Sequence, residues 1–133
     1  MLCDTKKLRL KTSKFISFDK PTNIPWNLFF IDSSLQSFFK KFIALGFKIA
    51  FGGALTFLNS KENKEVVKNI ELDDLLIETD APYLTPHPYR GSINEPKNIY
   101  LVVEEMSKLK DIEKEKIAQI TYNNACEVFG IEK

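Results

Sequence analysis

Two acidic residues at the end of an apolar run are the clearest sign of chemistry in this sequence. The run at 75–77 is followed by Glu78 and Asp80. Residues two apart on a strand share a face, so we expect both carboxylates at the carboxyl end of a strand, where parallel-sheet proteins place their active sites. A carboxylate buried there needs a cation, a proton or a basic partner. The pattern predicts a metal or general-base ligand, and the alternative is a salt bridge to Arg90 or Lys48.

The loop after this run carries a basic residue. Arg90 stands in a loop with four nearby prolines, at positions 82, 86, 88 and 96. Prolines reduce the entropy lost when a loop is ordered, and the planar guanidinium binds two oxygens of a phosphate or carboxylate at once. Arg90 is therefore a candidate substrate-binding residue, with Glu78 as a second one. The alternative is that Arg90 ties the loop to Asp80 or Glu95.

Other metal ligands are scarce. His87 is the single histidine, and Cys3 and Cys126 are the only cysteines, without the spacing of a metal site or a disulfide framework. Zinc-type sites need three or four ligands, so His87 is predicted to be an ordinary loop residue. Tyr83 and Tyr89 are candidates for stacking on bases, or for packing the loop against the body of the protein.

The elements that must position these residues alternate between strands and helices. Apolar runs predict buried strands at 26–31, 47–51 and 75–78, and residues 1–26 are expected to be irregular. Alternation of strands and helices implies parallel strands with right-handed crossovers. We therefore predict an α/β fold with about three parallel strands and flanking helices.

Helix signals separate and follow these strands. The first helix is predicted between Asp32-Ser33-Ser34, which can cap its start, and Gly46, which can end it. Asn59 and Glu62 resemble a capping box for the second helix. Further helices are predicted from Pro96 onward, at 113–120 and at 123–129, the last one capped by Gly130.

Composition limits the classes of function. A sequence of 133 residues predicts one domain, and a net charge of +1 provides no global attraction for DNA or anionic membranes. No run approaches the ~20 apolar residues of a membrane span, so no membrane association is expected. Two unpaired cysteines suit the reducing cytoplasm. The lysines and arginine at 6–14 are either a weak nucleic-acid site or a solvated terminus.

Several blocks from Leu45 onward form a family pattern. The most specific one contains Glu78 and Asp80 within ETDAPYL at 78–84. The blocks are LGFKIAFGG at 45–53, LTF at 55–57, LLIETDAPYLTP at 75–86, PYRG at 88–91, NEP at 94–96, IT at 120–121, NNA at 123–125 and FG at 129–130. Together they span about two-thirds of the sequence, and in them the sequence resembles the TatD-type metal-dependent deoxyribonucleases.

The resemblance implies the C-terminal part of a (β/α)8 TIM-type barrel of the amidohydrolase-like kind. Enzymes of this family hydrolyse phosphodiester bonds in DNA with divalent metal ions of the Mg, Mn or Zn type, so DNA is the implied partner. Asp80 matches the family's aspartate at the end of the last barrel strand, which is a metal ligand and a catalytic residue. Arg90 lies in a matching loop, but its direct role in substrate binding is our own hypothesis.

The departures from the family pattern concern the other metal ligands. The family has a His-x-His pair on its first strand, and a glutamate and two histidines on middle strands. The position of the last histidine falls at Phe30 or Phe29 here, neither of which binds metal. We expect an unmatched leader at 1–26, a partial TatD-like domain at 27–133, and a truncated nuclease that is inactive alone. The alternatives are one piece of a split enzyme that joins a complementary N-terminal half, or a non-catalytic module that self-associates through open sheet edges.

Overall fold

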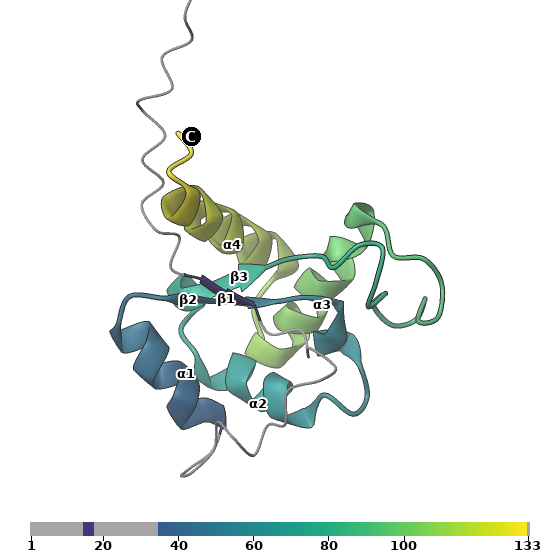
Figure 1. The fold of residues 1–133 in the computed structure, drawn as a ribbon, viewed down its shortest axis with the longest axis horizontal. Helices are drawn as coiled ribbons and strands as arrows, with labels where there is room; N and C mark the ends of the chain where they lie inside the picture. Colours follow the sequence, from purple (N-terminus) through teal and green to yellow (C-terminus); the bar gives the residue numbers. More distant parts are fainter. Residues whose placement is uncertain (1–14, 18–34, 133) are drawn as a thin grey trace, which may run out of the picture.

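The computed structural model describes residues 15–17 and 35–132. Three parallel strands form one sheet in the order β1-β2-β3, with β1 at Phe15–Ser17, β2 at Lys48–Phe51 and β3 at Leu75–Ile77. Phe15 is in register with Lys48, and Ile49 is in register with Leu75. Figure 1 shows α1 and α2 below the strands and α4 above them. The predicted α/β fold with three parallel strands is confirmed.

The described residues form four α-helices around the sheet. They are α1 (Leu35–Ala44), α2 (Lys61–Asn69), α3 (Ile99–Lys110) and α4 (Lys114–Phe129). Gly46 and Gly130 follow the first and last of these with φ angles of +82° and +65°, a left-handed conformation that favours glycine. Pro96 opens a short 3-10 helix, Pro96–Asn98, that leads into α3. The predicted ends of α1 and α4 and the predicted start of the helix at Pro96 are therefore confirmed.

The hydrophobic core lies between the sheet and these helices. Ile49, Ala50 and Phe51 are consecutive on β2, and all three are buried. Such continuous burial occurs when both faces of a parallel sheet are covered. The core consists of Phe39, Ile49, Phe51, Leu55, Val66, Val67, Ile70, Leu75, Val102, Val103, Met106 and Ile117. Each large member contributes roughly 1.5–3 kcal/mol by its burial, and together they hold β2 and β3 in place.

Strand β1 differs from the expected irregular structure of residues 1–26. Phe15–Ser17 pairs with β2 in a parallel ladder. Three residues among many lysines and serines are too few to show a strand period, and the pairing with β2 decides their conformation rather than their own propensity. The strand predicted at 26–31 lies outside the described residues.

The predicted capping box at the start of α2 is wrong. Ser60 is the N-cap residue and makes no side-chain capping hydrogen bond, and the helix begins at Lys61. Glu62 is then the second helical residue, whereas a capping box needs an acidic residue at the third. The first turn is held by its backbone, since the Lys64 amide donates to the Ser60 carbonyl at 3.1 Å.

The two short helices predicted at 113–120 and 123–129 are one continuous helix, α4. Two polar side chains on this stretch, Thr121 and Asn124, are buried and hydrogen-bonded inside the protein. The buried Thr121 hydroxyl donates to the Ile117 carbonyl at 2.9 Å. Asn124 donates from its side-chain amide to the carbonyls of Leu72 and Leu75, at 2.8 and 2.7 Å. These bonds let polar residues occupy the buried face of an unbroken helix.

Candidate functional site

Glu78 and Asp80 follow directly on β3, as predicted. The Glu78 amide donates to the Phe51 carbonyl at 3.1 Å, so the pairing with β2 extends past the last residue of β3. The Tyr83 amide donates to the Asp80 carbonyl at 2.6 Å and closes a turn immediately after the strand. Both acidic side chains are half-buried. The sheet and this turn therefore fix the Asp80 backbone at the carboxyl end of β3.

One carboxylate oxygen of Asp80 lacks a partner. Its Oδ2 atom is buried and accepts no hydrogen bond from the part of the chain that the structure describes. Buried polar atoms in native proteins are almost always paired, and an orphan indicates a missing partner such as an ion or a water. This oxygen is therefore the atom at which the site is incomplete.

The predicted salt-bridge alternatives are not formed. Lys48 instead pairs with Glu127 at 3.0 Å and donates to the Asp73 carbonyl at 2.7 Å. The Arg90 guanidinium carbon lies 4.3 Å from the centre of the Phe57 ring, in a cation–π contact. Neither basic side chain neutralises Asp80.

Arg90 ties its loop to Phe57 rather than to Asp80 or Glu95. The Glu95 carboxylate pairs with Lys97 at 2.6 Å. An exposed cation–π contact contributes about 0.5–1 kcal/mol, enough to orient the guanidinium without burying it. Arg90 itself is exposed. Within the described residues no carboxylate pairs with it, so its polar edge is suited to an anion.

The loop is held by its own polar groups. The Asn94 amide donates to the Pro82 carbonyl at 3.0 Å, and its side chain donates to the Tyr83 carbonyl at 2.8 Å. Thr85 donates from its hydroxyl to the Ser92 carbonyl at 2.5 Å. Asn94 is buried. In the sequence Asn94 stands out only as part of the NEP block at 94–96. Its role as the brace of this loop depends on contacts with Pro82 and Tyr83, which local sequence does not show.

A second anchor joins the loop to the 3-10 helix Gly53–Thr56. The His87 amide donates to the Thr56 hydroxyl at 2.8 Å. A Cβ atom on Gly53 would lie 2.1 Å from the Leu84 carbonyl oxygen, which no real structure tolerates. The missing side chain at Gly53 therefore lets the backbone of the loop pass close to the 3-10 helix.

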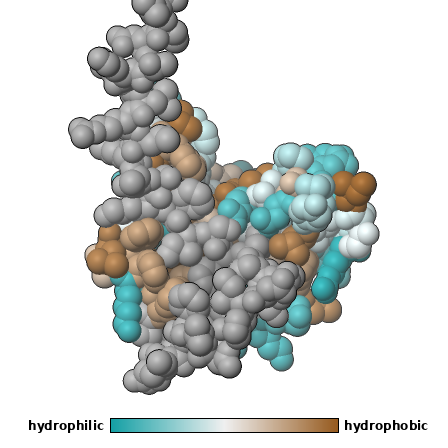
Figure 2. Space-filling model, in the orientation of Figure 1, coloured by the Kyte–Doolittle hydropathy of each residue, from teal (hydrophilic) through white to brown (hydrophobic). Residues whose placement is uncertain are grey.

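The loop presents aromatic side chains to solvent. Tyr83 is 74% exposed and Tyr89 is 52% exposed. A hydrogen bond with Tyr89 is the main reason why the pKa of Tyr100 lies above its usual value. Figure 2 shows hydrophobic and hydrophilic side chains mixed over this loop, at the upper right of the molecule. His87 is an exposed loop residue, as predicted.

The described residues fit a metal ion only in part. An aspartate oxygen is a suitable donor for Mg, Mn or Zn. Yet no group of three or more histidine, cysteine, aspartate or glutamate side chains capable of holding a metal occurs in the described ranges. The predicted position of the family's last histidine, Phe29 or Phe30, lies outside them. Asp80 therefore fits as one ligand of a site whose other ligands these residues do not supply.

Comparison with protein families gives a match to the TatD related DNase family over residues 32–130. The chain belongs to this family. The metal-dependent hydrolase YabD of Bacillus subtilis is 52% identical over 87 residues, which are 65% of this chain and 34% of YabD. The metal-dependent hydrolase YcfH of Escherichia coli K12 is 41% identical over 92 residues, which are 69% of this chain and 35% of YcfH.

Solved structures show the same relation. The TatD homologue YJJV of Escherichia coli K12 superposes with a TM-score of 0.68 at 28% identity, over 77% of this chain and 39% of that one. A TatD family hydrolase of Entamoeba histolytica, at 22% identity, shares the fold with a TM-score of 0.62, over 74% of this chain and 40% of that one. The predicted partial TIM-type barrel is confirmed, and this chain spans about a third of the length of the curated relatives it matches.

The comparisons separate what is established from what stays a prediction. The TatD family assignment made from the ETDAPYL block is confirmed, and the relatives are metal-dependent hydrolases. The boundary between a leader at 1–26 and a domain at 27–133 stays a prediction, as do the roles of Asp80, Glu78 and Arg90. No helix in the described part of the chain has both the length and the apolar character that crossing a membrane requires.

Proposed function

We propose that this chain supplies one part of the active site of a TatD-type deoxyribonuclease that hydrolyses phosphodiester bonds in DNA. The observation that carries the proposal is the buried Oδ2 atom of Asp80, which has no partner among the described residues. A buried polar atom without a hydrogen-bond partner does not stabilise the folded protein. Its position at the carboxyl end of β3 is where barrel enzymes present catalytic groups.

The chain's own residues take three roles in this proposal. Asp80 is the catalytic residue and metal ligand, held by the ladder to Phe51 and by the turn to Tyr83. Arg90 and Glu78 contact the substrate, with the Arg90 guanidinium directed at a phosphate group and oriented by Phe57. In such enzymes the bound divalent ion activates water and neutralises charge on the phosphate.

The isolated chain is inactive in this proposal. One carboxylate does not hold a divalent ion in a catalytic geometry, because such sites use three or more protein ligands. The described residues contain no group of three or more histidine, cysteine, aspartate or glutamate side chains that could hold a metal ion. We also propose a cytoplasmic location, supported by the absence of a disulfide framework in the sequence.

A chimera tests the proposed chemistry directly. Residues 32–130, the range matched by the family model, replace the corresponding segment of the Bacillus subtilis relative. We expect hydrolysis of DNA with Mg²⁺ or Mn²⁺, lost with chelator and reduced at least 100-fold by Asp80→Asn. The matched control is Asp111→Asn, at an exposed aspartate beyond the end of α3. It should leave the rate unchanged.

Two results contradict the proposal. A chimera that is folded but cuts DNA equally well with Asp80→Asn removes Asp80 from the site. Chelator-sensitive cutting by the isolated chain that requires Asp80 contradicts the predicted inactivity of the chain alone.

The alternative function is a non-catalytic interaction module that self-associates through its sheet edges. It is favoured by the position of β3, which ends the order of the described strands and pairs only with β2 among them. Exposed strand edges pair readily with other chains. Light scattering separates the two functions, since this module is a dimer or larger in solution without any metal.

A further inference from the structure

The turn after β3 is held through one peptide group, the one that joins Pro82 to Tyr83. Its N–H, on Tyr83, donates to the Asp80 carbonyl at 2.6 Å. Its carbonyl, on Pro82, accepts from the backbone amide of Asn94 at 3.0 Å. The Asn94 side chain also donates to the next carbonyl, that of Tyr83, at 2.8 Å. Asn94 therefore holds two consecutive carbonyls in the turn that begins at Asp80.

Asn94 is itself held from the direction of the core. Its side-chain oxygen accepts from the Asn98 side chain at 3.1 Å, and the two residues are only 4% and 7% exposed. Because this amide uses both its oxygen and its nitrogen, its orientation is fixed. Asn98 ends the short 3-10 helix that leads into α3, and α3 places Val102 and Met106 in the core. A continuous series of hydrogen bonds thus joins the start of α3 to the turn after β3.

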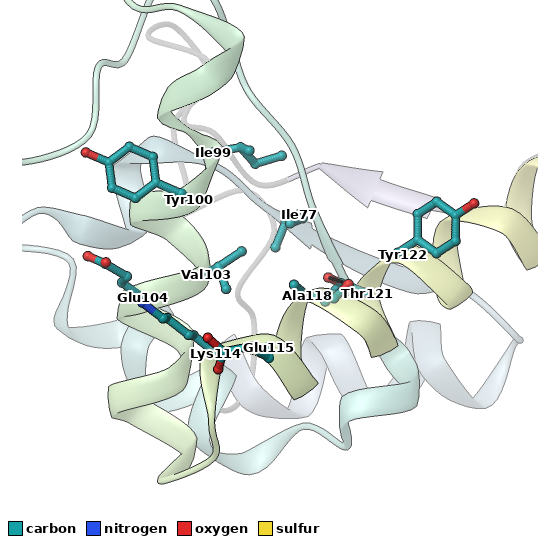
Figure 3. A pocket seen from close by; sticks show the side chains of 10 residues that line it. All are labelled: Ile77, Ile99, Tyr100, Val103, Glu104, Lys114, Glu115, Ala118, Thr121 and Tyr122. Carbon is teal, nitrogen blue, oxygen red and sulfur yellow. Dashed lines mark hydrogen bonds between the residues drawn. The ribbon is translucent and has the colours of Figure 1, made fainter.

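Apolar packing does not fix this junction by itself. Figure 3 shows Ile77 of β3 and Ile99 of α3 on the walls of the same pocket, whose volume is about 570 Å³. Open space lacks the contacts through which close packing fixes two elements. Ile77 stands shortly before Asp80, and Ile99 directly follows Asn98. The directional hydrogen bonds of the two asparagines therefore set the position of the turn relative to α3.

The Asp80 carboxylate depends on its backbone for its direction. Its Oδ2 atom is buried and has no partner among the described residues, so no hydrogen bond on that oxygen fixes the side chain. A buried carboxylate oxygen without a partner carries a desolvation penalty, which a movement into water relieves. The backbone is fixed before Asp80 by the bond from the Glu78 amide to the Phe51 carbonyl, and after Asp80 by the turn. Loosening the turn would release the carboxylate.

We propose that Asn94 is a positioning residue for Asp80, which keeps the carboxylate in its buried direction by holding the Pro82–Tyr83 peptide group. Asn98 acts through Asn94. The inference rests on the proposed function, in which the positioned carboxylate is the metal ligand and catalytic residue. Misplacing a reacting group by about 1 Å costs roughly 100-fold in rate. The competing role is purely structural: Asn94 would then only attach the loop at 82–93 to the rest of the protein.

The rotamer of Asp80 tests this role in the full chain, without metal or substrate. Three-bond nitrogen–carbon couplings measured by NMR report whether χ1 of Asp80 occupies a single staggered rotamer. We expect one rotamer in the unchanged chain and averaging in Asn94→Asp at neutral pH, because an ionised carboxylate cannot donate to the Tyr83 carbonyl. The matched control is Ser107→Ala, which removes a part-buried hydrogen bond to the Ile112 carbonyl near the other end of α3. It should leave the couplings unchanged.

The kinetics of the chimera described above give a second measurement. We expect Asn94→Asp to lower kcat about 10–100-fold with little change in KM. Asn98→Ala should lower kcat by a smaller factor, because the bond from Asn94 to the Tyr83 carbonyl remains. Ser107→Ala should retain kcat. Circular dichroism shows whether each variant is folded, and Asn98→Ala carries both measurements if Asn94→Asp is unfolded.

Three results overturn the inference. One is an Asp80 side chain that already averages between rotamers in the unchanged chain, or whose single rotamer survives both asparagine substitutions. Another is an equal loss of kcat in Ser107→Ala. The third is a raised KM with unchanged kcat in Asn94→Asp, which would assign Asn94 to loop attachment alone. A folded chimera without DNA hydrolysis contradicts the proposed function instead, and the Asp80 couplings then decide the inference by themselves.

Discussion

The two ends of β3 differ in how their polar groups are satisfied. At the start of the strand, Asn124 donates to the carbonyls of Leu72 and Leu75, so the buried amide and both carbonyls are paired. At the other end, the Oδ2 atom of Asp80 is buried without a partner among the described residues. The described residues therefore satisfy the polar groups at the first end and leave Asp80 Oδ2 unsatisfied at the second. Unpaired polar atoms of this kind collect at functional sites.

The largest change in the free energy of unfolding is expected at the start of β3, where Asn124 satisfies two carbonyls. Asn124→Ala removes two hydrogen bonds and leaves two carbonyls unsatisfied. We expect a loss of about 2–4 kcal/mol in the free energy of unfolding, measured by urea denaturation. Asn123→Ala on the same helix is the control, because among the described residues the Asn123 side chain accepts a single exposed hydrogen bond, from Gln119 at 3.3 Å. Equal losses in both variants would contradict the structural role of Asn124.

A smaller loss in the free energy of unfolding is expected where the loop after β3 contacts the 3-10 helix Gly53–Thr56. Gly53→Ala places a Cβ atom against the Leu84 carbonyl. We expect about 1–3 kcal/mol of destabilisation, because backbone has to move on one side of the contact. Hydrogen exchange should rise in the loop at 82–93 first. The same change at exposed Gly91 meets no atom within 4 Å but has a φ of +94°, so its cost is backbone strain without a clash.

At the incomplete end itself, substitution should cost the isolated chain little. Asp80→Ala removes the unpaired oxygen together with its desolvation penalty. We expect stability within about 1 kcal/mol of the unchanged chain, on the stabilising side, as is common when a functional residue is replaced. The measurement is the same urea titration. A loss above 2 kcal/mol would mean that Asp80 has a structural partner after all.

The smallest effect is a pH dependence at the completed end. Burial raises the pKa of Asp74 above its usual 3.8, with Lys48 acting in the opposite direction. The folded state therefore holds this proton to a higher pH than the unfolded state does, and Asp74 makes folding less favourable as the pH rises from 3.8 through the raised pKa. Asp74→Asn should remove this fall in stability. The measurement is the thermal midpoint at a pH near 3.8 and at a pH above the raised pKa, and the difference between these two midpoints should be smaller in the variant. An unchanged difference contradicts it.

Local patterns in the sequence were sufficient for much of the fold. The apolar run before Glu78 is a strand, and α1 and α4 end next to Gly46 and Gly130, as predicted. Each depends on neighbours within a few residues, or on one residue type that alone tolerates a left-handed backbone. The family could be identified for the same reason, because its most specific motif is continuous in sequence.

Other features depended on contacts between distant residues, and only the tertiary structure decided them. The two helices predicted at 113–120 and 123–129 are one helix, in which Asn124 donates to the carbonyls of Leu72 and Leu75. Strand β1 is a strand because β2 lies beside it. Arg90 rests on Phe57 instead of Asp80. By itself the sequence determined which residues have reactive side chains and where most of the regular elements lie, β1 and the continuity of α4 excepted. Their pairing and desolvation followed from packing, because burial and hydrogen bonding depend on segments that are far apart along the chain.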